Sequence, residues 1–226
     1  MKLRGAIFDM DGTLIDSLYY WKPFWRDLGA KFLHREDYAP PKEIDLCVRT
    51  MIFTEAMAYV WEALGISASV EEVVSFGAEH LTDFYRYKVK AKRGAYALLD
   101  RLKAAGVRMC VASATDRKYL SIALDACGLT PYFDTVLSCG DIGVGKDQPD
   151  IYLLALEELG LNACDCAVFE DSYVALETAK RIGCRTVGVF DENNFAQDRL
   201  QAASDVYLGE GKALDAILPS IFQETT

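Results

Sequence analysis

A regular alternation of short apolar runs and longer amphipathic segments extends from Gly94 to Phe190, and it constrains the fold more than any other feature. The apolar runs predict buried strands, and the segments with apolar residues at helical spacing predict helices. Together with an earlier apolar run, the expected strands are Leu3–Phe8, Val107–Ala112, Thr135–Ser138, Cys166–Phe169 and Arg185–Phe190. The expected helices are Ala95–Ala105, Lys118–Ala126, Pro149–Leu159 and Tyr173–Ile182. This pattern predicts an α/β fold, a doubly wound Rossmann-like parallel sheet with helices on both faces.

Residues 17–90 interrupt the alternation. They show no clear strand and hold more than half of the aromatic residues, and helical spacing recurs in Thr50–Leu64 and Val70–Tyr87. We expect a small helical domain inserted after the first strand, with most of its aromatics packed in its own core. The expected division is therefore an α/β core of residues 1–16 and 91–226 and an inserted helical domain of residues 17–90. The tail, Asn193–Thr226, is expected to add a peripheral strand and helix.

Charge and cysteine content limit the partners of the chain. A net charge of −10 argues against nucleic acid or an anionic membrane as a partner, and no apolar segment reaches the roughly 20 residues that span a bilayer. The seven cysteines form no Cys-x-x-Cys pair and the two histidines lie far from them in sequence, which predicts reduced thiols and no zinc site. The first strand follows Met1 directly, so we expect no cleaved signal and a cytoplasmic protein, a monomer or a small homo-oligomer.

Two carboxylates, Asp9 and Asp11, directly follow the first expected strand within Asp9-Met10-Asp11-Gly12-Thr13. The carboxyl ends of the strands in an open parallel sheet border its ligand crevice. Acids so close together repel each other and are rarely left unpaired at a buried edge, so either a cation lies between them or one of them is protonated. The alternative is an Asp-Gly turn that only ends the strand.

Three further positions lie at or near strand ends: Ser113, Lys146 and the pair Glu170-Asp171. Each has a structural alternative, a helix N-cap for Ser113 and for either Asp171 or Ser172, and a solvated loop charge for Lys146. Their occurrence together favours one shared site. Oxygen-only acidic ligands favour a hard cation such as Mg²⁺, and an ammonium and a hydroxyl can hold phosphoryl oxygens. The set therefore predicts phosphoryl transfer in which a carboxylate attacks phosphorus.

These motifs resemble those of a known family. Asp9-x-Asp11-Gly12-Thr13, Ser113, Lys146 and Glu170-Asp171 are similar to the four motifs of the haloacid dehalogenase superfamily of phosphotransferases. The longer strings, which resemble the beta-phosphoglucomutase/phosphoglycolate phosphatase branch, are Asp9-Met10-Asp11-Gly12-Thr13-Leu14-Ile15-Asp16-Ser17, Lys146-x-x-Pro149-Asp150-Ile151 and Phe169-Glu170-Asp171-Ser172. That branch carries a helical cap domain between its first two motifs, which agrees with the insert at residues 17–90.

The resemblance implies roles for the four acids. Asp9 would be the nucleophile and a Mg²⁺ ligand. Asp11 would bind the metal through its backbone carbonyl, while its carboxyl acts as general acid and then as general base toward water. Asp171 would be the second carboxylate ligand, and Glu170 would bind the metal or order a metal-bound water.

The resemblance also implies that Ser113, the backbone amide of Ala114 and Lys146 bind the transferring phosphoryl group, with Lys146 also offsetting the charge of Asp9. The implied function is a Mg²⁺-dependent phosphatase that hydrolyses a small phosphorylated metabolite through an aspartyl-phosphate. The cap residues expected to select the leaving group are Tyr20, Trp21, Lys22 and Arg49.

Two alternatives to the phosphatase stay open. One is a phosphomutase of the beta-phosphoglucomutase type, although those mutases have a cap-hinge histidine where this chain has Trp21. The other is a non-catalytic phosphate-sensing protein, against which the intact nucleophile and acid argue. The presence of Asp11 argues against dehalogenation, because the dehalogenases lack this second aspartate.

Overall fold

The computed structural model of the chain describes residues 3–49, 51, 53–194 and 196–222. They form two compact units, one of residues Met1–Leu18 and Val89–Thr226 and the other of residues Tyr19–Lys88. None of the helices within the described ranges is long and apolar enough to cross a membrane.

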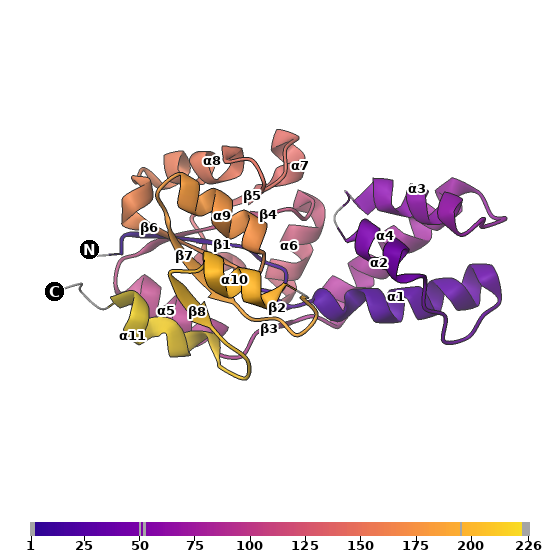
Figure 1. Cartoon of the computed structure of the whole chain (residues 1–226), viewed down its shortest axis with the longest axis horizontal. Helices are drawn as coiled ribbons and strands as arrows, with labels where there is room; N and C mark the ends of the chain where they lie inside the picture. Colours follow the sequence, from indigo (N-terminus) through magenta and orange to yellow (C-terminus); the bar gives the residue numbers. More distant parts are fainter. Residues whose placement is uncertain (1–2, 50, 52, 195, 223–226) are drawn as a thin grey trace. The chain divides into compact units, whose positions relative to one another are not determined.

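The first unit is built on a six-stranded parallel sheet with strand order β5-β4-β1-β6-β7-β8 (Figure 1). The strands are β1 Gly5–Phe8, β4 Arg108–Ser113, β5 Thr135–Ser138, β6 Cys166–Glu170, β7 Arg185–Val189 and β8 Val206–Leu208. Every residue of β1 and β6 is buried, as expected for central strands covered on both faces. The predicted α/β parallel-sheet fold is confirmed.

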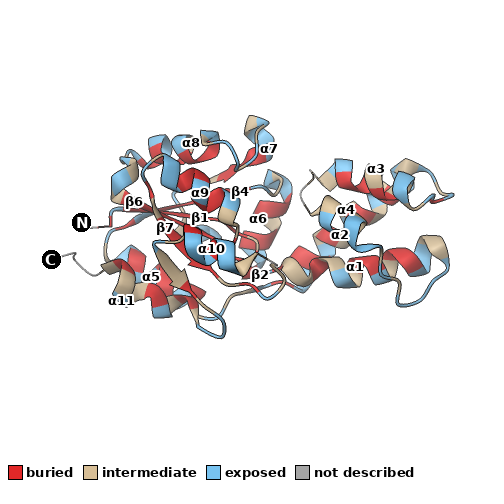
Figure 2. Ribbon diagram, viewed as in Figure 1, coloured by how far each residue is buried: buried red, intermediate tan, exposed pale blue. Residues whose placement is uncertain are grey.

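Helices cover the sheet. They are α5 Ala95–Ala104, α6 Arg117–Ala126, α7 Cys139–Ile142, α8 Asp150–Leu159, α9 Tyr173–Arg181, α10 Gln197–Ala203 and α11 Leu218–Phe222. The four predicted between Gly94 and Phe190 correspond to α5, α6, α8 and α9, with α7 and α10 in addition. Apolar residues of α8, α9 and α10 form one core with Ile7, Val168 and Cys110 of the sheet, and the buried faces of these helices are visible in Figure 2. The expected tail strand and helix correspond to β8 and α11, while the last four residues, 223–226, lie outside the described residues.

A short antiparallel ribbon joins β2, Ile15–Asp16, to β3, Lys90–Ala91, where the chain leaves the first unit and returns to it. Neither strand was expected, because two residues are too short to produce a recognisable alternation. The four-residue helix α7 was missed for the same reason.

The second unit is helical, as expected for the insert. It contains η1 Leu18–Tyr20, α1 Trp21–Leu28, η2 Gly29–Leu33, α2 Lys42–Val48, α3 Phe53–Ala63 and α4 Val70–Tyr87, although Leu18 itself belongs to the first unit. A capping box between Ser69 and Glu72 fixes the start of α4, which spans the predicted range. Positions 50 and 52 of the expected segment Thr50–Leu64 lie outside the described residues.

Aromatic side chains build the core of this unit, in agreement with the prediction. Tyr20 stacks on Phe24 with ring centroids 5.5 Å apart and meets Phe84 edge to face at 5.0 Å. Gly77 allows close packing of α4 on α3, because a Cβ there would overlap the Met57 side chain and force it to move.

Candidate active site

The carboxyl ends of adjacent strands bring the expected acids and the expected serine to one edge of the sheet. Asp9 directly follows β1, Ser113 ends β4, and Glu170 ends β6 with Asp171 next in the chain. Because β1 pairs in parallel with both β4 and β6, these residues reach the same edge, where parallel α/β sheets bind their ligands. The Asp9 amide continues the ladder by donating to the carbonyl of Phe169 at 2.9 Å.

Asp9, Glu170 and Asp171 form a tight acidic cluster. One carboxylate oxygen of each lies within 4.8 Å of the others, and all three residues are buried. Burial and mutual repulsion both disfavour three ionised carboxylates at this spacing. The cluster therefore requires positive charge or retained protons.

Lys146 provides one positive charge. Its ammonium lies 2.5 Å from Oδ1 of Asp9 and also contacts Oε1 of Glu170, and its side chain is only 10% exposed. Burial alone would lower the pKa of Lys146, but the charges of Asp9 and Glu170 raise it well above the ordinary value. The alternative of a solvated loop charge is therefore wrong.

The other two acids still lack full compensation. Burial is the main cause that raises the pKa of Glu170, to about 7, and Lys146 opposes the rise while Asp9 adds to it. Burial, then the charges of Glu170 and Asp9, raise the pKa of Asp171. Glu170 also accepts hydrogen bonds from the Ser172 amide at 3.1 Å and from the Tyr152 hydroxyl at 3.4 Å.

The donor set fits a hard divalent cation. Three carboxylates carry up to three negative charges against one ammonium, and all of the clustered ligand atoms are oxygens. A cation at the cluster would offset the charges of Glu170 and Asp9, which together with burial raise the pKa of Asp171. Oxygen-only ligands of this kind suit Mg²⁺ better than a softer metal.

Two hydroxyl groups hold the carboxylate of Asp11. Ser17 donates to Oδ1 at 2.6 Å, and Thr115, from the loop after β4, donates to Oδ2 at 2.7 Å. Asp11 is thereby anchored to both the chain segment that follows the acidic motif and the loop that follows Ser113. Sequence reasoning assigned no role to Ser17, which ends the first motif string, or to Thr115, two residues after Ser113.

Gly12 allows the acidic loop to approach Asp171. Its φ is +74°, and a Cβ at this position would lie 2.7 Å from Oδ2 of Asp171 and 2.8 Å from Cδ1 of Leu18. Only glycine satisfies both the left-handed backbone and this close contact. The Asp-Gly turn is thus present, but it serves to place the loop against the acidic cluster.

Ser113 is buried, and its hydroxyl oxygen accepts a hydrogen bond from the Thr115 amide at 3.2 Å. It does not cap a helix, because α6 begins at Arg117 with Asp116 at the N-cap position. Ala114 follows Ser113 and is exposed. Asp171 does not occupy the N-cap of α9 either, which is Ser172.

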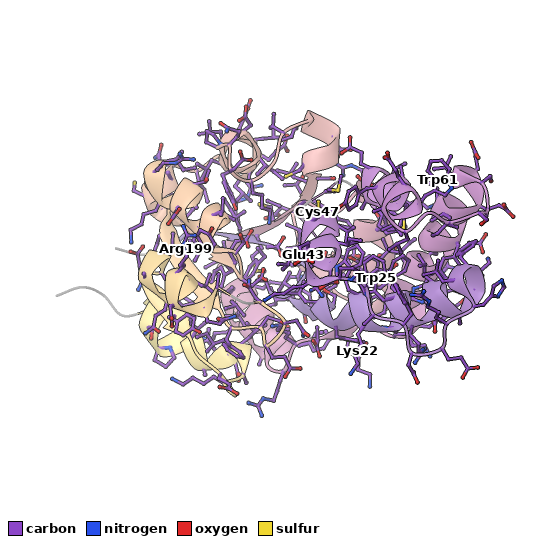
Figure 3. The ribbon with its side chains drawn as sticks, turned by 45° about the vertical axis from the view of Figure 1, so that its right-hand side comes forward. Lys22, Trp25, Glu43, Cys47, Trp61 and Arg199 are labelled. Carbon is purple, nitrogen blue, oxygen red and sulfur yellow. The ribbon has the colours of Figure 1, made fainter. Side chains whose placement is uncertain are left out.

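The expected cap residues differ in their surroundings within the second unit. Tyr20 is buried among the aromatics, and Trp21 meets Tyr20 edge to face at 5.3 Å. Lys22 and Arg49 instead line a pocket of about 590 Å³ in this unit, together with Trp25. Lys22 is exposed and Trp25 is buried on the same helix (Figure 3).

Comparison with known proteins identifies the family. The haloacid dehalogenase-like hydrolase family matches residues 3–183. Protein CbbY of Rhodobacter capsulatus is 31% identical, with 83% of this chain and 85% of the relative covered. A phosphorylated carbohydrates phosphatase of Thermotoga maritima is 29% identical, with 89% and 92% covered. Among solved structures, a candidate beta-phosphoglucomutase from Thermotoga maritima has a TM-score of 0.80 and 25% identity, covering 96% of this chain and 99% of its own.

The chain belongs to the haloacid dehalogenase-like hydrolase family. The resemblance drawn from the motifs is confirmed, and so is the expected enzyme class, a phosphatase-like hydrolase of this family.

Proposed function

We propose that this chain is a Mg²⁺-dependent phosphatase that hydrolyses a small phosphorylated metabolite through an aspartyl-phosphate intermediate. The observation that carries the proposal is the buried cluster of Asp9, Glu170 and Asp171 with Lys146 in contact with two of the three acids. Asp9, Asp171 and Glu170 would hold the cation directly or through water, joined by the backbone carbonyl of Asp11. When bound, Mg²⁺ supplies the positive charge that lets an anionic phosphate approach these acids.

The chain's own residues then divide the chemistry into two displacements. A carboxylate oxygen of Asp9 attacks phosphorus, the bond from phosphorus to the leaving oxygen breaks, and the Asp11 carboxyl gives its proton to that oxygen. In the second step water attacks the acyl phosphate, Asp11 takes the proton of the water, and the bond to Asp9 breaks to release phosphate. Lys146, the Ser113 hydroxyl and the Ala114 amide hold the phosphoryl oxygens throughout.

We assign substrate selection to the second unit, residues Tyr19–Lys88, acting as a cap domain that excludes bulk water. Lys22 and Arg49 line a pocket of this unit, and we assign them the role of contacting a polar leaving group. Tyr20 is buried, so we assign Tyr20 and Trp21 a supporting role in the shape of this region. The carbohydrate phosphatase of Thermotoga maritima supports phosphorylated sugars or polyols as the substrate class.

A phosphomutase remains the second candidate, because the solved structure named above is a candidate beta-phosphoglucomutase. In that case the phosphoryl group of Asp9 would pass to a sugar hydroxyl instead of water. Trp21 in place of the mutase histidine favours hydrolysis. Phosphorus NMR on hexose phosphates separates the two, since only the mutase produces an isomeric phosphate ester.

The phosphatase is tested by phosphate release over a panel of sugar phosphates, polyol phosphates, phosphoglycolate, nucleotides and cofactor phosphates. We expect turnover that EDTA abolishes and Mg²⁺ restores. Asp9→Asn should lose essentially all activity, because the amide cannot form the intermediate. Asp83→Asn, which changes an exposed carboxylate of α4, is the matched control and should retain activity. Turnover in metal-free buffer, or substantial activity of Asp9→Asn, would contradict the mechanism.

A further inference from the structure

The loop between β7 and α10 contacts the acidic cluster through one side chain. The side-chain amide nitrogen of Asn194 donates to the backbone carbonyl of Asp171 at 2.5 Å and to Oδ2 of the same residue at 3.2 Å. One amide group thus contacts both the main chain and the carboxylate of Asp171. No sequence motif marked this residue.

The orientation of Asn194 is itself determined by its loop. Its side-chain oxygen accepts a hydrogen bond from the Ala196 amide at 3.2 Å, so its nitrogen faces Asp171. The backbone amide of Asn194 donates to the backbone carbonyl of Asp191 at 3.0 Å. The backbone carbonyl of Asn194 accepts a hydrogen bond from the side chain of Gln197 at 3.0 Å. Asn194 is therefore a fixed donor rather than a mobile surface side chain.

A buried ion pair anchors this loop. Asp191 is 3% exposed, and its Oδ2 lies 2.8 Å from the ammonium of Lys92, whose side chain is 15% exposed. The same ammonium donates to the carbonyl of Phe190 at 3.0 Å. The Lys92 backbone amide donates to the carbonyl of Leu14 at 2.8 Å, which ties the pair to the segment after the acidic motif.

We propose that Asn194 is a positioning residue that holds Asp171 toward Asp9 and Glu170, and that the Lys92–Asp191 pair keeps the loop of Asn194 in place. Asp171 faces two other acids, whose repulsion favours side-chain orientations that turn away from the cluster. The hydrogen bond from Asn194 opposes that movement, so the carboxylate is already oriented when a cation arrives. This inference rests on the proposed function, because the oriented carboxylate matters as a ligand of Mg²⁺.

Mg²⁺ binding to the purified, metal-free protein tests the inference by isothermal titration calorimetry. Loss of a hydrogen bond to a ligating carboxylate typically costs roughly 10–100-fold in metal affinity, and we expect Asn194→Ala to fall in that range. At saturating Mg²⁺ its kcat should return close to the wild-type value, which damage to the fold would not allow. Asn162→Ala changes an exposed asparagine outside the site and is the matched control.

A double variant, Lys92→Met with Asp191→Asn, removes the ion pair without leaving an unpaired buried charge, and it should weaken Mg²⁺ binding in the same direction. Mg²⁺ affinity of Asn194→Ala within about twofold of wild type would overturn the inference and leave the proposed phosphatase intact. Wild-type protein that binds no Mg²⁺ would overturn both. Weakened binding in Asn194→Ala, with no turnover of any ester by the wild type, would overturn only the phosphatase.

Discussion

Replacement of Gly12 by alanine separates two physical effects that the structure places at one position. The backbone of Gly12 has φ +74°, where a side chain costs roughly 1–2 kcal/mol. The new Cβ would also lie 2.7 Å from Oδ2 of Asp171 and 2.8 Å from Leu18 Cδ1. Relief of these contacts requires movement of Asp171 and Leu18, and overpacking of this kind typically costs about 1–3 kcal/mol.

Gly106 provides a matched control, because it has the same φ of +74° and its added Cβ would meet no atom within 4 Å. Gly106→Ala therefore carries the backbone cost alone. The loss of chain entropy in the unfolded state is common to both substitutions and cancels in their difference. The free energy of unfolding of Gly12→Ala should be lower than that of Gly106→Ala by about 1–3 kcal/mol.

The free energies come from urea unfolding followed by circular dichroism, and Mg²⁺ affinity comes from calorimetry on the same two variants. Only Gly12→Ala should lose Mg²⁺ affinity, because only this substitution displaces Asp171. Equal unfolding free energies for the two variants, or normal Mg²⁺ binding by Gly12→Ala, would refute the argument that Gly12 is needed for close approach to the cluster.

Two further predictions concern charge and burial. Lys146→Ala should lower kcat/KM by a factor that corresponds to about 3 kcal/mol, the typical loss for one preorganised contact to the transition state; a decrease below about tenfold would remove Lys146 from the site. Burial raises the pKa of the Cys166 thiol to about 12 and those of Cys139 and Cys184 to about 11. Since only the thiolate reacts, iodoacetamide at pH 8 should label exposed Cys164 in the folded protein and the three buried thiols only after unfolding, as mass spectrometry of peptides would show. Rapid labelling of Cys166 in the folded state would contradict the burial.

The parts of the fold that were predictable have strong local signals. The alternation from Gly94 to Phe190 identified β4, β5, β6 and β7 to within about one residue at each end. Parallel strands place their carboxyl ends at the same edge of a sheet. The predicted strands therefore also indicated that Asp9, Glu170 and Asp171 would lie close together. Their distance from one another in the chain is irrelevant once the sheet has formed.

The parts that were not predictable depend on contacts between distant segments. The contact of Thr115 with Asp11 joins residues 104 positions apart, and that of Asn194 with Asp171 depends on the course of an irregular loop. Neither residue has a pattern of its own that distinguishes it from an ordinary loop side chain. Tyr20 illustrates the converse, since its neighbours within the second unit bury this aromatic, which no pattern in the sequence indicates.

The contact of Lys146 with both Asp9 and Glu170 has a consequence for how the enzyme is assembled. Many small metal-binding domains stay unfolded until metal arrives, because their metal site does not exist in the unfolded chain. Here the Lys146 ammonium already offsets part of the negative charge, so we expect the polypeptide to reach its native state before any metal ion binds. Chelation should then abolish activity without unfolding the protein, and added metal ion should restore activity without a refolding step.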